Sequence, residues 1–328
     1  MKSYQFRSYI VKDREYFEYV EVDPKLEQIT GRKLPITKSD LPLMESLIGF
    51  FYLDREELAA ICERISTALR AYRPNEDFEN FLTIRNGLEE LSGKHIFFKL
   101  LELDWRERLH QADLHPESFQ DYLPINEIEE LPPEVFERQQ RMEELFTCVM
   151  EFGLDKRTVA ERMADFSSVK VLQDEKTFPF SKLTVGYEWV SVAAVTEVLY
   201  PESVFDLVDF YLHECIRREI PLRRCKSCGR WFALTGHQGW EYCTRVFDDK
   251  GRTCRDVGAI NTWTAKRSED EVFKIYRREY KKRFGWIKAG KIAADDFYRW
   301  SEQARLKKLA CDKGEITLEE FTAWLGRS

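Results

Sequence analysis

Apolar residues along most of the chain recur at helical spacing. In residues 54–69 they lie three or four positions apart, as in one face of an amphipathic helix: Leu58, Ile61, Cys62, Ile65 and Leu69. Asp54, followed three residues later by Glu57, predicts the start of this helix as a capping box does. Comparable patterns predict helices over residues 76–91, 132–151, 154–166 and 202–219, and Pro132 with Pro133 is expected to open the second of these.

Shorter stretches alternate with period two and predict a small β component. The first 23 residues form two such stretches around a polar turn at 12–15, which predicts a β-hairpin. Strands are also predicted at 169–172 and 183–189, on either side of a turn at Pro179. Residues 24–42 are expected to form a loop marked by prolines, and residues 95–103 suit either a buried strand or a helix.

The last sixty residues are again helical in pattern. Helices are predicted at 268–284, 294–310 and 317–325, and Thr317 with Glu320 forms a capping box at the start of the last one. The middle helix should turn four residues partly inward: Phe297, Trp300, Ala304 and Leu309. The expected fold class is therefore mainly α with a small β component (α+β).

Four cysteines between residues 221 and 263 stand at metal-ligand spacing. They form two pairs, Cys225 with Cys228 and Cys243 with Cys254. Four thiolates from two separated halves can reach the corners of a tetrahedron, which is the usual structural zinc site. Such a site leaves no open coordination position for water, so the expected cofactor is structural zinc. His237 could replace one cysteine, but its place between glycines favours an exposed loop.

The residues around these cysteines predict a treble-clef-like zinc finger. Gly229 after Cys228 allows the backbone to turn with positive φ. Trp231 and Phe232 are expected to form one strand of a hairpin, and residues 240–243 the returning strand. Thr253 is expected to cap a helix over residues 254–264, so that Cys254 lies in its first turn. The other four cysteines lie in helix-like segments and suit small buried apolar positions: Cys62, Cys148, Cys215 and Cys311.

The sequence of this segment resembles a known family. CKSCGRWF, WEYC and TCRDVGAINTW, followed by a helix rich in tyrosine and basic residues, resemble an uncharacterised bacterial family catalogued as a domain of unknown function, mainly over residues 224–325. The segment is also loosely similar to CGNR-type zinc fingers, which are associated with transcriptional regulation. It departs from them because Cys254 is followed by Arg255, Asp256 and Val257. The resemblance implies the same four cysteine ligands.

Charge is distributed unevenly along the chain. Residues 1–220 contain 27 Lys and Arg against 43 Asp and Glu, and residues 221–328 contain 24 against 15. The asymmetry coincides with the first cysteine pair, which predicts an acidic, mostly helical domain over residues 1–220 and a basic zinc-finger unit with C-terminal helices over residues 221–328.

Basic residues gather on one side of the predicted helix at 268–284. Aromatic residues that recur at three- and four-residue steps should face a core: Phe273, Tyr276, Tyr280 and Phe284. At about 100° per residue the cations then share another side of the helix: Lys274, Arg277, Arg278, Lys281 and Lys282. These five are candidate phosphate contacts with DNA or RNA. The alternative, that they dock on an acidic protein surface, stays open.

Signatures of other functions are weak or missing. Asp174 and Lys176 have the Asp-x-Lys form of some metal-dependent nucleases, although a charged turn explains them as well. The sequence contains no phosphate-binding glycine loop, so it gives no indication of a small-molecule cofactor. The N-terminus lacks the apolar core of a signal peptide and no apolar run is long enough to span a bilayer, so a cytoplasmic protein without a membrane partner is expected.

The hypothesis from the sequence is a zinc-stabilised binding protein, with nucleic-acid binding and regulation as its leading form. A protein–protein interaction module is the alternative and a metal-dependent nuclease the minority one. A binding protein is favoured over an enzyme, because the closed zinc site supplies no catalytic position.

Overall fold

The computed structural model describes residues 5–20, 35–74, 77–153, 155–172, 182–192, 194–258, 271–312 and 314–327. The chain divides into two compact units. The first comprises Met1–Arg224 and Arg230–Trp240, and the second comprises Cys225–Gly229 and Glu241–Ser328. The architecture confirms the expected α+β class, with small antiparallel sheets among many helices. Among the described residues, no helix combines the length and the apolar character that crossing a membrane requires.

The first unit contains a five-stranded antiparallel sheet with strand order β3-β2-β1-β5-β4. Its strands are β1 (Gln5–Val11), β2 (Arg14–Val20), β3 (Ile36–Pro42), β4 (Val185–Ser191) and β5 (Ala194–Leu199). The predicted N-terminal hairpin is confirmed, with Gln5 paired to Val20 and Val11 paired to Arg14. The loop expected at 24–42 is wrong for its last part, because β3 pairs along the whole of β2. The side chains of β3 are mostly exposed, so this edge strand has little apolar alternation to reveal it.

Helices make up the rest of the first unit. They are α2 (Glu45–Phe51), α3 (Arg55–Ala71), α4 (Phe78–Lys94), α5 (Phe98–Leu114), α6 (Ile125–Leu145), α7 (Val159–Leu172) and α8 (Val204–Arg217), with a 3-10 turn at Phe119–Tyr122 and a π-helical turn at Phe146–Met150. The predicted start of α3 is confirmed, because the Asp54 side chain accepts a hydrogen bond from the Glu57 amide. The ambiguous stretch 95–103 is helical from Phe98 onward, as the first part of α5.

Two predictions in this region are wrong. Pro132 and Pro133 lie inside α6 and do not open it. The helix continues through them because Ile128, Leu131 and Val135 are buried on its core side, and this packing outweighs the lost backbone hydrogen bonds. The strand expected at 169–172 is the last turn of α7.

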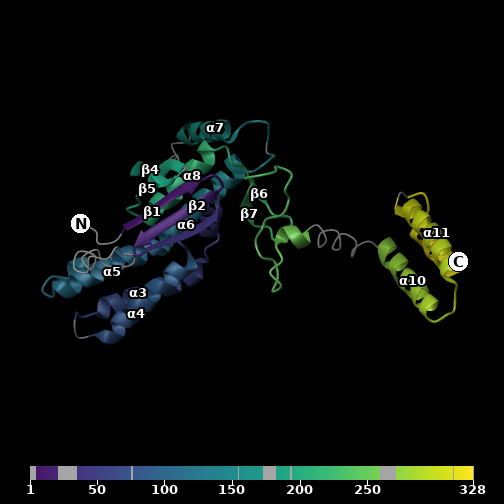
Figure 1. The fold of residues 1–328 in the computed structure, drawn as a ribbon, viewed down its shortest axis with the longest axis horizontal. Helices are drawn as coiled ribbons and strands as arrows, with labels where there is room; N and C mark the ends of the chain where they lie inside the picture. Colours follow the sequence, from purple (N-terminus) through teal and green to yellow (C-terminus); the bar gives the residue numbers. More distant parts are fainter. Residues whose placement is uncertain are drawn as a thin grey trace. The chain divides into compact units, whose positions relative to one another are not determined.

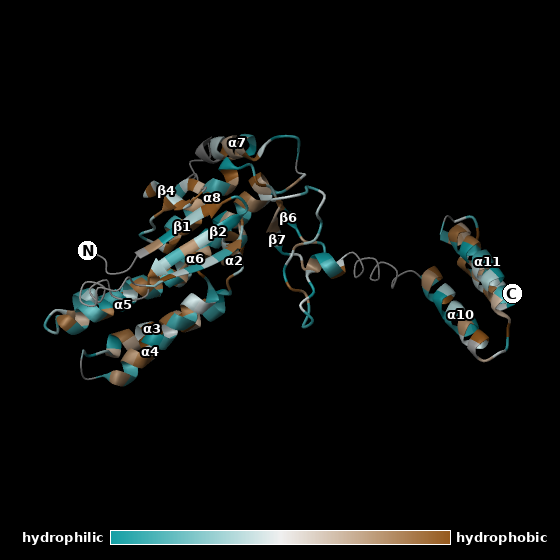
Figure 2. Ribbon diagram, viewed as in Figure 1, coloured by the Kyte–Doolittle hydropathy of each residue, from teal (hydrophilic) through white to brown (hydrophobic). Residues whose placement is uncertain are grey.

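The sheet and the helices share one apolar core. Helix α8 packs on the sheet, where the Tyr211 ring lies 5.9 Å from the Phe17 ring and the Tyr211 hydroxyl bonds the Ser8 hydroxyl at 2.6 Å. Helix α3 lies beside α4 (Figure 1), and both carry brown and teal residues along their length in Figure 2. The amphipathic pattern of the sequence therefore corresponds to a buried face on each helix.

His95 is buried in this core as a neutral imidazole. Its Nδ1 accepts a hydrogen bond from the Phe97 amide at 3.2 Å, so Nε2 carries the proton and donates to the Ser46 carbonyl at 2.9 Å. Burial lowers the pKa of His95 to about 4.

His95 is expected to lower the stability of the native protein as pH falls from about 6.5 to about 4. In that range unfolded chains bind a proton on His95 that the folded protein excludes, which costs on the order of 2 to 3 kcal/mol of unfolding free energy. Burial raises the pKa of Glu15 to about 8, which acts in the opposite direction, so the His95 contribution is the difference between the native protein and His95→Gln in urea unfolding at pH 7 and pH 4.5. His110→Gln, which alters an exposed histidine, should show the same pH dependence as the native protein. Equal pH-dependent changes in the native protein and His95→Gln would contradict the expectation.

The second unit contains a small helical bundle of α10 (Glu271–Lys288), α11 (Ala294–Asp312) and α12 (Leu318–Arg327). Its core consists of Phe297, Trp300, Ala304, Phe321 and Leu325. The Thr317 capping box is confirmed, because Thr317 Oγ1 accepts from the Glu320 amide and the Glu320 carboxylate accepts from the Thr317 amide. Leu309, expected to turn partly inward, is half exposed.

Candidate metal centre and basic helix

The first two cysteines of the cluster lie in a tight loop between two short strands. Strands β6 (Leu222–Arg224) and β7 (Trp231–Ala233) pair antiparallel, and Cys225 and Cys228 lie in the loop that joins them. Gly229 has φ of 72° and its amide donates to the Cys225 carbonyl at 2.8 Å. The predicted positive φ at Gly229 is therefore confirmed.

The expected hairpin partner of β7 is wrong. Residues 240–243 do not form a strand, and Trp231 pairs with Arg224 in β6. Leu222 and Trp231 are both fully buried in the core of the first unit, and this shared burial explains why these two strands pair. Residues 240–243 reach the cysteine loop by one backbone hydrogen bond, in which the Lys226 amide donates to the Glu241 carbonyl at 3.0 Å.

Cys254 begins a helix, as the sequence predicts. Thr253 caps it, because its hydroxyl accepts from the Asp256 amide at 3.2 Å and the Asp256 carboxylate accepts from the Thr253 amide at 2.8 Å. The helix is described as far as residue 258, and its predicted continuation to 264 lies outside the described residues. Gly258 is required at its position, since a Cβ atom there would meet the Tyr242 ring at 2.1 Å. Tyr242 thus packs directly against this helix, next to Cys243.

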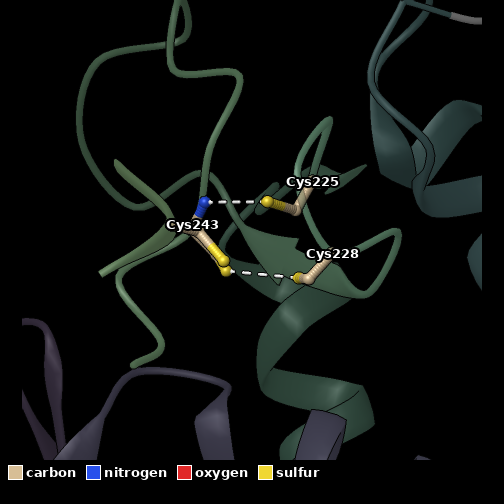
Figure 3. A group of neighbouring side chains, drawn as sticks. Cys225, Cys228 and Cys243 are labelled. Carbon is tan, nitrogen blue, oxygen red and sulfur yellow. Dashed lines mark hydrogen bonds between the residues drawn. The ribbon is translucent and has the colours of Figure 1, made fainter. Parts of the chain in front are cut away.

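The structure brings all four predicted ligands together. Their sulfur atoms lie within 4.8 Å of one another, and the Cys228 and Cys243 sulfurs are 3.7 Å apart (Figure 3). This distance is far too long for a disulfide bond of about 2.05 Å. It is close to the roughly 3.8 Å between sulfurs at the corners of a tetrahedron with metal–sulfur bonds of about 2.3 Å. The group could therefore hold a metal ion.

Burial and backbone amides act in opposite directions on these thiols. Cys225, Cys243 and Cys254 are buried, and Cys228 is exposed. Burial raises the pKa of Cys225, but the amides of Cys228, Cys243 and Ser227 outweigh it and lower the pKa to about 7. Burial, together with the nearby Cys225, raises the pKa of Cys243. Four adjacent thiolates would repel one another, and a cation between them would offset this repulsion.

The remaining cysteines and His237 lie outside the cluster. Cys62 and Cys215 are buried, and burial raises the pKa of Cys62 to about 12, which suits an inert apolar position. Cys148 is exposed, which differs from the expected buried position, and Cys311 is half-buried. His237 is exposed in a loop, where its Nδ1 accepts from the Gly239 amide at 2.9 Å.

The five basic residues predicted to share a helix side are all exposed on α10. These are Lys274, Arg277, Arg278, Lys281 and Lys282. The other side of α10 packs on the bundle core through Val272, Ile275, Tyr276, Tyr280 and Ile287. The Tyr280 ring, for example, lies 5.1 Å from the Phe297 ring. Phe284 is 43% exposed, so its expected inward position holds only in part.

The nuclease signature cannot be placed, since Asp174 and Lys176 lie outside the described residues. The segment between the last two cysteines has a structure that the sequence pattern did not predict. Residues 245–253, between the last two cysteines, form a closed hairpin with two exposed apolar side chains, Val246 and Phe247. Asp248 followed by Gly251 is the turn signal that could have revealed it.

Comparison with known proteins gives one match. No curated protein and no solved structure matches the chain. The matched region contains β5, α8, the four cysteines and the basic helix α10. Residues 190–325 match a family of unknown function, DUF6076.

Proposed function

We propose that Cys225, Cys228, Cys243 and Cys254 bind one zinc ion in a structural role. The donor set supports zinc, because four sulfurs at near-tetrahedral separation are typical of structural zinc sites. Four protein ligands complete the coordination, so the ion has no position for a reacting water. Its contribution is to join the Cys225–Gly229 loop, the segment around Cys243 and the helix that begins at Cys254.

We further propose that this zinc-stabilised protein binds nucleic acid and acts as a regulator. The observation that carries the proposal is the basic side of α10, where five cationic side chains are exposed together. Rows of Lys and Arg neutralise phosphates and release the counterions bound to them, and this supplies most of the affinity of non-specific binding.

The existing contacts of these cations leave them available to phosphates. Lys282 pairs with Glu279 at 3.2 Å, and the Arg277 guanidinium lies 5.9 Å from the Phe273 ring. An exposed ion pair of this kind contributes only about 0 to 1 kcal/mol. A phosphate can therefore replace such a contact at little cost.

The proposal predicts salt-dependent binding that the basic side of α10 controls. Reversing the charge of Arg277, Arg278, Lys281 and Lys282 should abolish retention of the zinc-loaded protein on DNA or RNA at low salt. Neutralising the same four residues should reduce the slope of log affinity against log salt by about 3 to 4. Fluorescence anisotropy across a salt series measures both changes.

A matched pair of variants separates this surface from net charge. Arg277→Glu with Lys281→Glu changes α10, and Arg305→Glu with Lys307→Glu makes the same charge change at exposed positions of α11. The α10 pair should weaken binding by at least tenfold more than the α11 pair. Absence of any salt-dependent binding by the intact, zinc-loaded protein would refute the proposed function.

A protein–protein interaction module is the second candidate. The excess of acidic residues in positions 1–220 favours it, because an acidic protein surface could neutralise the same cations. In that case the native protein would not bind nucleic acid. The α10 variants would instead weaken its association with an acidic protein surface.

We propose a cytoplasmic location. None of the eight cysteines, all of which lie in the described residues, forms a disulfide bond, a state that a reducing compartment maintains. The proposal assigns no catalytic residue.

A further inference from the structure

The segment between Cys243 and Cys254 is a preformed hairpin, here called the inter-cysteine hairpin (residues 245–253). Val246 and Thr253 form an antiparallel bridge. The Phe247 amide donates to the Arg252 carbonyl at 2.6 Å, and the Cys254 amide donates to the Arg245 carbonyl at 2.9 Å. Both ends of the hairpin therefore lead directly into cysteines of the cluster.

Asp248 closes the tip of this hairpin. Its Oδ1 accepts from the Lys250 amide at 3.1 Å and from the Arg252 amide at 3.2 Å. Its Oδ2 accepts from the Arg252 guanidinium at 2.5 and 2.8 Å, and these bonds to Arg252 lower the pKa of Asp248. Gly251 completes the turn with φ of 72°. A loop fixed in this way loses little conformational entropy when it binds a ligand.

The inter-cysteine hairpin holds apolar side chains in solvent. Val246 is 69% exposed and Phe247 is 45% exposed. The neighbouring Lys250 is exposed as well. An exposed aromatic ring and an exposed cation on one closed hairpin have the chemistry of a stacking platform, in which the ring takes the flat face of an unpaired base and the cation approaches the phosphate.

Charge favours nucleic acid over a protein as the occupant. The inter-cysteine hairpin belongs to the second unit, where Lys and Arg outnumber Asp and Glu by 21 to 15. Within the hairpin the Asp248 carboxylate is paired with Arg252, and Asp249 and Lys250 are both exposed. The exposed cations of α10 belong to the same unit.

We infer that the inter-cysteine hairpin contacts unpaired bases of a single-stranded nucleic acid and that Phe247 stacks on one of them. The inference rests on the proposed nucleic-acid function and adds the strandedness of the partner. In duplex DNA the base faces are stacked on one another, so Phe247 has no free base face on which to stack.

The test compares two probes and three variants of the full-length, zinc-loaded chain. The probes are a fluorescent oligothymidine of about 15 nucleotides and a duplex of the same length. Phe247→Leu keeps an apolar side chain and removes the ring, Phe247→Trp restores a ring, and Tyr298→Leu removes an exposed ring from α11. Zinc content by native mass spectrometry verifies that each variant keeps its metal.

Phe247→Leu should weaken oligothymidine binding by about 5- to 100-fold and leave duplex binding unchanged. Phe247→Trp and Tyr298→Leu should bind both probes as the native protein does. Unchanged oligothymidine affinity in Phe247→Leu overturns the inference and leaves the proposed nucleic-acid function intact. The same result is expected if the hairpin docks on a protein. Absence of salt-dependent binding to either probe overturns both.

Discussion

Replacing Cys254 by serine should remove zinc from the protein. One of four thiolates is then missing, and the oxygen that replaces it is a poorer ligand for a sulfur-rich site. The affinity for zinc should fall by more than the roughly 10- to 100-fold that changes in outer-shell partners cause. Native mass spectrometry of the reduced protein should show one bound zinc ion in the native chain and none in Cys254→Ser.

The loss should extend to the fold of the segment around the cluster. Structural zinc contributes on the order of 10 kcal/mol to small domains of this kind. Residues 241–258 should therefore become accessible to limited proteolysis in Cys254→Ser and in Cys225→Ser. Cys148→Ser is the matched control, because Cys148 is an exposed cysteine outside the cluster and its replacement should change neither zinc content nor proteolysis. Zinc that stays bound in Cys225→Ser and Cys254→Ser would refute the metal assignment.

Trp231→Ala should destabilise the first unit by about 3 to 5 kcal/mol. The ring is fully buried, lies 6.0 Å from the Phe146 ring and has the Arg224 guanidinium 4.4 Å from its centre. The Trp231 amide also donates to the Tyr52 hydroxyl at 2.8 Å. Truncation leaves a large cavity among these groups, and denaturant unfolding at fixed zinc concentration measures its cost.

Trp189→Ala provides the comparison for this variant. Trp189 is 73% exposed on β4, so its truncation should change the unfolding free energy by less than about 0.5 kcal/mol. A similar loss in both variants would show that the effect of Trp231→Ala does not come from burial in the core.

Local chemistry made part of this fold predictable. Asp54, Thr253 and Thr317 cap helices in the structure as their sequence patterns indicate, because a cap depends only on residues a few positions away. The clustering of the four cysteine sulfurs could be predicted as well, because their spacing along the chain is that of metal ligands. The exposed side of α10 follows from helical periodicity.

Features that depend on distant partners could not be predicted in this way. Strand β3 exists because β2 offers it a pairing edge, and its own residues ITKSDLP carry no strand signal. Pro132 and Pro133 normally mark a helix start, yet buried neighbours continue α6 through them. Trp231 looks like the first strand of a hairpin with residues 240–243, and only the core around Phe146 explains its pairing with β6.

The hairpin of β6 and β7 has a consequence for dividing this chain. The Cys225–Gly229 loop belongs to the second unit, while the strands on either side belong to the first. A fragment that ends at residue 224 lacks Trp231, and a fragment that starts at residue 241 lacks two of the four cysteines. The family-matched region 190–325 also contains β5, whose partner β1 lies outside it. No single cut in the chain therefore yields both units complete, because each unit contains residues from both sides of the other's boundary.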